Sequence, residues 1–182
     1  TDRDAEPPVV TTQQLDLFEG YQIPPLSILS EPPESNVFLS QSDVDILSRT
    51  VEEKLASFGI GVAVTDVTQG PVVTLFEVKP EAGVKINRIV SLENDLAMAL
   101  RASRLRIIAP IPGRGTVGIE IPNRKPNIVC LREILESAEF ENSKGPLTFG
   151  LGKTIEGRPY VCNLAKMPHL LIAGATGSGK SV

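Results

Sequence analysis

The combination that restricts the fold most strongly lies near the carboxyl end, where an apolar run leads directly into a glycine-rich loop. Residues 169–173 read HLLIA and do not alternate, which is typical of a strand buried on both faces of a parallel sheet. The residues that follow have the spacing G-x4-G-K-S of a P-loop. Because a P-loop connects a buried strand to a helix, we expect residues 145–182 to open an α/β domain, with earlier short strands at 147–151 and 160–162.

The loop residues are of the types that hold the phosphates of a nucleotide. Glycines let several backbone N–H groups point inward and form a nest for the β-phosphate. Lys180 supplies a positive charge for the β- and γ-phosphates, and Ser181 offers its hydroxyl to Mg²⁺. The predicted cofactors are therefore ATP and Mg. The predicted nucleotide-binding residues are Gly174, Ala175, Thr176, Gly177, Ser178, Gly179, Lys180 and Ser181.

Residues 1–36 differ from the remainder in charge and in proline content. They hold seven acidic residues and one basic residue, a net charge of −6, whereas residues 37–182 carry a net charge of +2. Six of the fifteen prolines occur here in pairs, and proline removes backbone donors and fixes φ. We interpret residues 1–36 as the end of an acidic, Pro-rich linker. Its apolar stretch 21–29 either docks on a folded neighbour or remains a disordered tether.

Residues 37–144 predict a small α+β domain. The first helix is expected to start at a capping box formed by Ser42 and Asp45, and to end at Gly59, which suits the left-handed position after a last turn. Apolar periodicity and turn residues predict the later elements. They are strands 62–67 and 72–78, a helix at 92–102 capped by Ser91, strands 104–109 and 116–121, and a helix at 131–138.

Composition excludes several classes of protein. Two cysteines outside any metal-ligand spacing exclude a disulfide framework and a Cys-based zinc site. No apolar run reaches the roughly 18 residues of a membrane span, and no basic-then-apolar leader opens the sequence. We therefore expect this segment to be soluble and cytoplasmic, with Cys130 and Cys162 as inert buried thiols and His169 as a packing or hydrogen-bonding residue.

Basic residues between positions 101 and 132 form a second candidate site, because such groups bind phosphates and release counterions. The candidates for DNA contact are Arg101, Arg104, Arg106, Arg114, Arg124 and Lys125. The alternative is that these residues and Arg132 are solvated, contact another subunit, or pair with Glu93, Glu120 and Glu133. No aromatic residues interleave with them, which argues against stacking on single strands. Lys153 and Arg158, on either side of Gly157, either contact nucleotide or a neighbouring subunit or have no such role.

Several separated motifs occur in the same order as in the FtsK/SpoIIIE double-stranded DNA translocases of bacteria, which this sequence closely resembles. The motifs are GPVVTLFEVKPEAGVKINRIVSLENDLAMALRA (70–102), VGIEIPN (117–123), LREIL (131–135), LGKTIEG (151–157) and LAKMPHLLIAGATGSGKSV (164–182). The resemblance covers roughly residues 21–182, since YQIPPLSIL is similar to the segment that precedes the motor in that family.

The resemblance implies that residues 37–144 are the α domain of such a motor and that residues 145–182 begin its RecA-like β domain, which carries the P-loop. The family motor is a hexameric ring around duplex DNA that uses ATP to move chromosomal DNA at the division septum. The implied partners are therefore double-stranded DNA, further copies of the chain, and the cell-division and recombination machinery. The intact family members are anchored in the inner membrane by helices that precede a Pro-rich linker.

Two other functions remain as alternatives. A P-loop motor of the same superfamily can move protein instead of DNA, as secretion ATPases do. The α domain can also act as a non-catalytic ring scaffold, a role that is compatible with the DNA motor.

The residues that complete a site for phosphoryl transfer are expected to lie outside these 182 residues. Such transfer needs an acidic strand end to hold Mg²⁺, a residue that positions water, and an arginine from a neighbouring subunit. The catalytic residues are therefore unassigned, and this segment is expected to hold half of a nucleotide site.

The purified 182-residue chain should consequently hydrolyse ATP no faster than buffer, because the P-loop alone lacks those groups. Phosphate release measured with and without the chain checks this expectation. Turnover that disappears when the P-loop is altered would contradict it.

Overall fold

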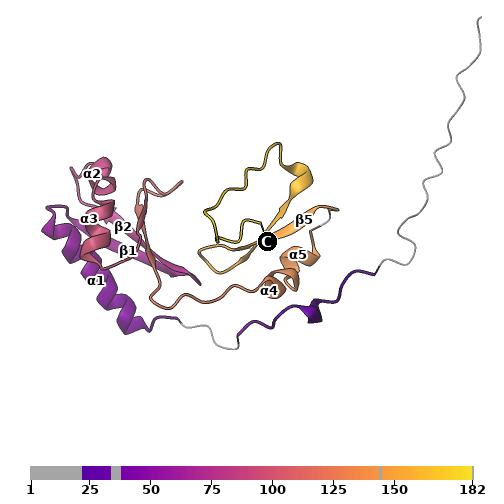
Figure 1. The fold of residues 1–182 in the computed structure, drawn as a ribbon. Helices are drawn as coiled ribbons and strands as arrows, with labels where there is room; N and C mark the ends of the chain where they lie inside the picture. The colour runs from indigo at the N-terminus through magenta and orange to yellow at the C-terminus, as the bar shows by residue number, and fades with distance from the viewer. Residues whose placement is uncertain (1–21, 34–37, 144, 182) are drawn as a thin grey trace, which may run out of the picture.

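A four-stranded antiparallel sheet is the larger of the two sheets in the computed structural model, which describes residues 22–33, 38–143 and 145–181 (Figure 1). The strand order is β1-β2-β4-β3. The strands are β1 (Val62–Gln69), β2 (Val73–Pro80), β3 (Arg106–Ile108) and β4 (Val117–Pro122). The two predicted hairpins are therefore confirmed, although β3 is shorter than expected.

Three helices cover one face of this sheet: α1 (Gln41–Ser57), α2 (Ile86–Val90) and α3 (Glu93–Ala99) (Figure 1). Side chains alternate between the two faces of a strand, so β2 and β4 direct every second residue toward these helices. The fully buried core contains Val51 and Leu55 from α1, Ile89 and Leu96 from α2 and α3, and Phe76, Val78, Val117 and Ile119 from the strands. This sheet lobe (residues 38–123) confirms the predicted α+β class.

The start of α1 differs from the expected capping box by two residues. Ser40, not Ser42, is the N-cap, and its Oγ accepts a hydrogen bond from the Asp43 N–H at 3.2 Å. Ser40 and Asp43 have the same S-x-x-D spacing as Ser42 and Asp45, so the motif alone did not distinguish the two positions. The predicted end is confirmed, because Gly59 follows the helix at a φ of +72°.

The two later helices predicted in this region differ from the expectation in their ends. The helix expected at 92–102 is present as α3, which is shorter and has Leu92 as its N-cap; Ser91 instead ends α2, which was not predicted, and Arg101 follows α3 with a φ of +53°. Residues 131–138 divide into α4 (Leu131–Leu135) and α5 (Ala138–Glu141). The reason for this division is local, since the Ser137 Oγ accepts the Phe140 N–H at 3.3 Å and starts a new helix.

A hairpin of β5 (Thr148–Lys153) and β6 (Pro159–Asn163) forms a smaller unit with α4 and α5. Ile134 of α4 is 2% exposed and lies over Gly150 of β5, where a Cβ would approach the Ile134 Cγ2 to 2.5 Å. We call residues 131–143 and 145–166 the hairpin lobe. It ends in the short 3-10 helix η2 (Leu164–Lys166).

The expected strand at 169–173 is not formed: in the described part of the chain these residues pair with no strand. Leu171 is 90% exposed and Ile172 is 67% exposed. The apolar run is typical of a buried strand, but a strand exists only where a neighbouring strand pairs with its N–H and C=O groups. Both sheets of the described residues are antiparallel, so the parallel sheet is not seen here.

The segment that precedes the sheet lobe makes limited contact with the hairpin lobe. It includes the 3-10 helix η1 (Leu26–Ile28), and Glu31 forms an ion pair with Arg132 of α4 at 3.3 Å. Ile23 and Ile28 are 83% and 70% exposed, so the apolar stretch from residue 22 to 29 is not buried by docking. Residues 1–21, which hold most of the expected linker, lie outside the described residues. None of the described helices combines the length and hydropathy needed to cross a bilayer.

Truncation of the core should destabilise the sheet lobe strongly. Leu55→Ala removes a side chain of α1 that is fully buried against the sheet and should lower the free energy of unfolding by about 2–5 kcal/mol. Ile46→Ala, on the same helix but 62% exposed, is the matched control and should change it by no more than about 0.5 kcal/mol. Urea unfolding followed by circular dichroism measures both values, and equal losses would contradict this description of α1.

Candidate nucleotide-binding site

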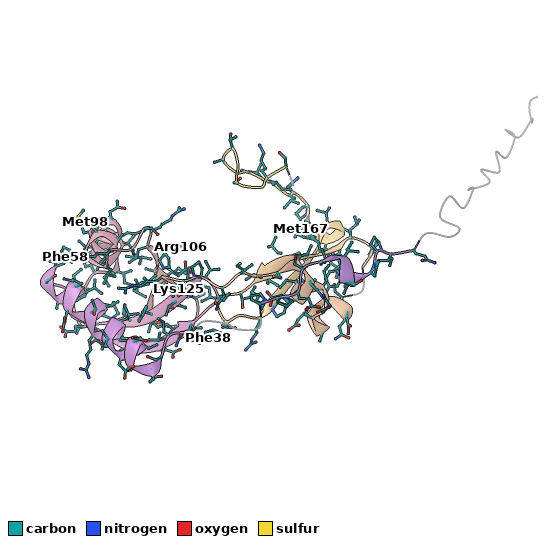
Figure 2. The ribbon with its side chains drawn as sticks, turned by 60° about the horizontal axis from the view of Figure 1, so that its bottom comes forward. Phe38, Phe58, Met98, Arg106, Lys125 and Met167 are labelled. Atoms are coloured by element: carbon teal, nitrogen blue, oxygen red, sulfur yellow. The ribbon has the colours of Figure 1, made fainter. Side chains whose placement is uncertain are left out.

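The P-loop, residues 174–181, is a chain of tight turns on the surface. Gly177 and Gly179 have φ values of +83° and +84°, which residues with a Cβ rarely adopt. The Ser178 N–H donates a hydrogen bond to the Ala175 C=O at 3.1 Å. The described loop residues are exposed, and Figure 2 draws their side chains beyond Met167.

The third glycine of the loop lies in a close approach. A Cβ at Gly174 would lie 2.3 Å from the Oγ of Ser178, so a larger residue here would require the Ser178 side chain to move. Three of the loop's glycines are thus explained by the backbone conformation or by a close approach. This is the property that lets a backbone wrap around a phosphate group.

The donors of this loop fit a triphosphate and a hard cation. Backbone N–H groups and the Lys180 ammonium are hydrogen-bond donors suited to phosphate oxygens, and the Ser181 hydroxyl oxygen is a ligand type that Mg²⁺ accepts. Residues 164–181 also contain two lysines and no carboxylate, so the local charge favours an anion.

The segment that leads to the loop is positioned at its start by the hairpin lobe. Asn163, the last residue of β6, caps η2 by accepting the Ala165 N–H on its Oδ1 at 2.9 Å. Beyond η2 the chain forms no helix or strand before the loop, and residues 168–173 are exposed; they include His169, which is not packed in a core. The structure therefore fixes where the segment leaves β6, and the glycines fix the local shape of the loop.

Comparison with known proteins gives matches along almost the whole chain. Residues 23–123 match the family described as "FtsK alpha domain", and residues 130–182 match the "FtsK/SpoIIIE family". The chain belongs to the FtsK/SpoIIIE family. The expected resemblance is thereby confirmed, and residues 174–181 of this chain lie inside the second match.

Three curated relatives, each named DNA translocase FtsK or FtsK 1, illustrate the similarity. The protein of Campylobacter jejuni is 51% identical over 164 residues, which cover 90% of this chain and 17% of the relative. The protein of Caldanaerobacter subterraneus is 50% identical over 173 residues, which cover 92% of this chain and 24% of the relative. The protein of Neisseria meningitidis is 45% identical over 186 residues, which cover 98% of this chain and 22% of the relative. The chain thus spans about a fifth of the length of these relatives.

The six basic candidates for DNA contact do not gather at one place. Arg104 and Arg106 border a cavity of about 650 Å³ beside β3, together with Glu93 and Glu120. The expected pairing with Glu120 is found for Arg106, at 3.9 Å, although the Arg106 side chain remains 72% exposed. The others are Arg101 after α3, Arg114 in the loop before β4, and Arg124 and Lys125 after β4; Figure 2 labels Arg106 and Lys125.

Arg114 has a partner that the sequence did not indicate. Its guanidinium binds Glu77 of β2, a side chain only 7% exposed, and lies 4.0 Å from Asp66. The Thr116 hydroxyl is 3.4 Å from the second oxygen of Glu77. Hydrogen bonding to Glu77, and the charge of that carboxylate, raise the pKa of Arg114. A signal was present, because Glu77 stands between the apolar residues Phe76 and Val78 of β2, and a buried carboxylate needs a charged partner.

Lys153 and Arg158 are also engaged within the chain. The Lys153 Nζ lies 2.5 Å from Glu133, and both side chains are 19% exposed. The other oxygen of Glu133 accepts the Cys130 N–H at 2.8 Å, which ties the start of α4 to β5. Arg158 forms an exposed pair with Glu156 at 3.5 Å. Glu133, which was considered as a partner for arginine, therefore belongs to Lys153.

The remaining candidates are the two cysteines, a metal site and Arg132. Cys130 and Cys162 are half-buried thiols without a disulfide bond, so they are less buried than expected. No group of three potential metal ligands from His, Cys, Asp and Glu occurs in the described residues. Arg132 pairs with Glu136 at 2.7 Å and with Glu31, again inside the chain.

Arg114→Ala should destabilise the sheet lobe, because it leaves the buried Glu77 carboxylate with only the Thr116 hydroxyl nearby. We expect a lower urea midpoint at pH 7, with partial recovery in the double variant Arg114→Ala/Glu77→Gln. Arg124→Ala, at an exposed arginine, serves as the control and should leave the midpoint unchanged. A midpoint unaffected by Arg114→Ala would show that the pair does not stabilise the fold.

Proposed function

We propose that this chain supplies the α domain and the P-loop-bearing start of the ATPase domain of an ATP-driven double-stranded DNA translocase. The observation that carries the proposal is the order of features in one chain: a match to the FtsK alpha domain, then an FtsK/SpoIIIE match that contains the P-loop. The relatives named DNA translocase FtsK, in which about half of the aligned residues are identical to this chain, support DNA as the cargo.

We assign the domain division from the sequence and use packing to adjust its second boundary. Residues 1–36 end a linker, the next part is the α domain, and the last part begins a RecA-like domain. The sequence places the second boundary at 144/145. However, α4 and α5 pack on β5 and β6, and Glu133 of α4 pairs with Lys153 of β5. This packing supports an earlier boundary, between residues 123 and 130.

In this proposal the loop binds the nucleotide, and the hairpin lobe fixes the start of the segment that leads to the loop. Backbone N–H groups of residues 174–181 donate to the phosphates, Lys180 adds a charge, and Ser181 is a ligand for Mg²⁺. ATP with Mg²⁺ supplies the phosphoanhydride bond whose hydrolysis drives movement. The catalytic residues for that hydrolysis are unassigned. The role that we propose for these residues is to bind and orient the nucleotide and to act as a scaffold for assembly into a ring.

The larger context belongs to the proposal too. The working assembly is a hexameric ring around duplex DNA at the division septum, anchored in the inner membrane and acting with the cell-division and recombination machinery. Exposed basic residues remain candidates for phosphate contact, whereas Arg114 is held by Glu77. The exposed candidates are Arg101, Arg104, Arg106, Arg124 and Lys125.

A protein that carries this sequence together with the rest of the ATPase domain tests the proposal. Duplex DNA should stimulate its ATP hydrolysis, and the stimulation should weaken as salt rises, because phosphate contacts release counterions. Lys180→Ala should abolish both ATP retention and turnover. The matched control is Lys166→Ala, an exposed lysine outside the loop, which should leave both unchanged. Stimulation by unfolded protein but not by duplex would favour a secretion motor, and ATP retention that survives Lys180→Ala would refute the nucleotide site.

A further inference from the structure

The two lobes touch where the turns of their hairpins meet. Gly70 lies in the turn between β1 and β2 and is buried. A Cβ at this position would lie 2.3 Å from the carbonyl oxygen of Ile155 and 3.1 Å from its carbonyl carbon. Ile155 belongs to the turn between β5 and β6, so a main-chain carbonyl of the hairpin lobe rests directly on the Cα of Gly70.

The Gly70 side of this contact is held by hydrogen bonds within the sheet lobe. The Gly70 N–H donates to Val73 at 2.9 Å, and its C=O accepts the Asn123 Nδ2 at 2.8 Å. Asn123 is held in turn by the Thr74 hydroxyl, at 2.8 Å, and by the Val72 carbonyl, at 2.9 Å. These hydrogen bonds therefore fix the position of Gly70 within the sheet lobe.

The turn that contains Ile155 is also held by hydrogen bonds, within the hairpin lobe. The Thr154 N–H donates to Arg158 at 2.8 Å, and the Gly157 N–H donates to Thr154 at 2.9 Å. Gly157 has a φ of +80°, which gives the turn its sharp return. Lys153, directly before the turn, is fixed to α4 through Glu133.

A cavity of about 460 Å³ beside this contact is lined from both lobes. Leu75, Glu77 and Arg114 line it from the sheet, and Thr154, Ile155 and Glu156 line it from the turn. The lobes consequently do not pack face to face at this point, and the short main-chain contact determines their separation there.

We propose that Gly70 is a positioning residue: it seats the β5–β6 turn and thereby sets how the lobe that leads to the P-loop lies on the four-stranded sheet. We call the contact between Gly70 and Ile155 the joint; it is observed in the described residues and does not depend on the proposed function. Its consequence for turnover rests on the proposed function, because only then is the hairpin lobe part of an ATPase.

Gly70→Ala tests the joint without any nucleotide. The added methyl group must displace Ile155, so backbone amides of residues 154–158 should exchange with deuterium several-fold faster, while the β2 amides paired with β4 keep their protection. Gly115→Ala is the matched control, because a Cβ there meets nothing within 4 Å and neither glycine has a positive φ. Unchanged exchange at 154–158 would overturn the proposal.

A second variant covers the possibility that Gly70→Ala distorts its own turn, since a Cβ would also lie 2.9 Å from the Val73 carbonyl oxygen. Gly157→Val strains the turn of the hairpin lobe alone, because valine resists a φ of +80°. If Ile155 and Gly70 hold the two lobes together, loosening the β5–β6 turn should also make the backbone amides of Gly70 and Asn123 exchange faster with deuterium. Exchange that rises only within the hairpin lobe would refute the joint.

The consequence for function has a separate readout in the completed ATPase. Gly70→Ala should lower the kcat of DNA-stimulated ATP hydrolysis several-fold and leave the KM for ATP unchanged, because the P-loop itself is intact. A kcat equal to that of Gly115→Ala would overturn the positioning role. Failure of the proposed function is recognised independently, by ATP retention that does not depend on Lys180.

Discussion

One-sided burial of the four-stranded sheet is the constraint on which the other features depend. Phe76 and Val78 of β2, and Val117 and Ile119 of β4, are fully buried beneath the helices. Each buried methylene contributes about 0.8 kcal/mol, so the register of the central strand pair is strongly fixed. With that register set, the residues between them, Glu77 among them, must lie on the opposite face.

The opposite face therefore carries a different chemistry. Glu77 is nearly buried there and is compensated by Arg114. This face also borders the two cavities and meets the turn of the hairpin lobe. A sheet with one apolar face and one mixed face thus separates two tasks, since helices stabilise the first face and the second is available for contact with the part of the chain that leads to the P-loop.

The sequence predicted the sheet and its hairpins because strand alternation and turn residues are local signals. The P-loop was predicted for the same reason, and the left-handed values of Gly177 and Gly179 agree with the role assigned to its glycines. Helix ends were less accurate, since two S-x-x-D pairs compete at the start of α1. The strand at 169–173 was wrong because its burial requires neighbouring strands, which the described residues do not provide.

By itself, the sequence determined the family, the order of the strands in the sheet lobe and the position of the P-loop, all of which depend on residues close together along the chain. Only the tertiary structure decided that Arg114 belongs to Glu77, that Lys153 belongs to Glu133, and that the Ile155 carbonyl rests on Gly70. The physical reason is that these partners come from different strands, helices and turns. Their distances are set by how whole elements pack, and no local spacing in the sequence encodes that packing.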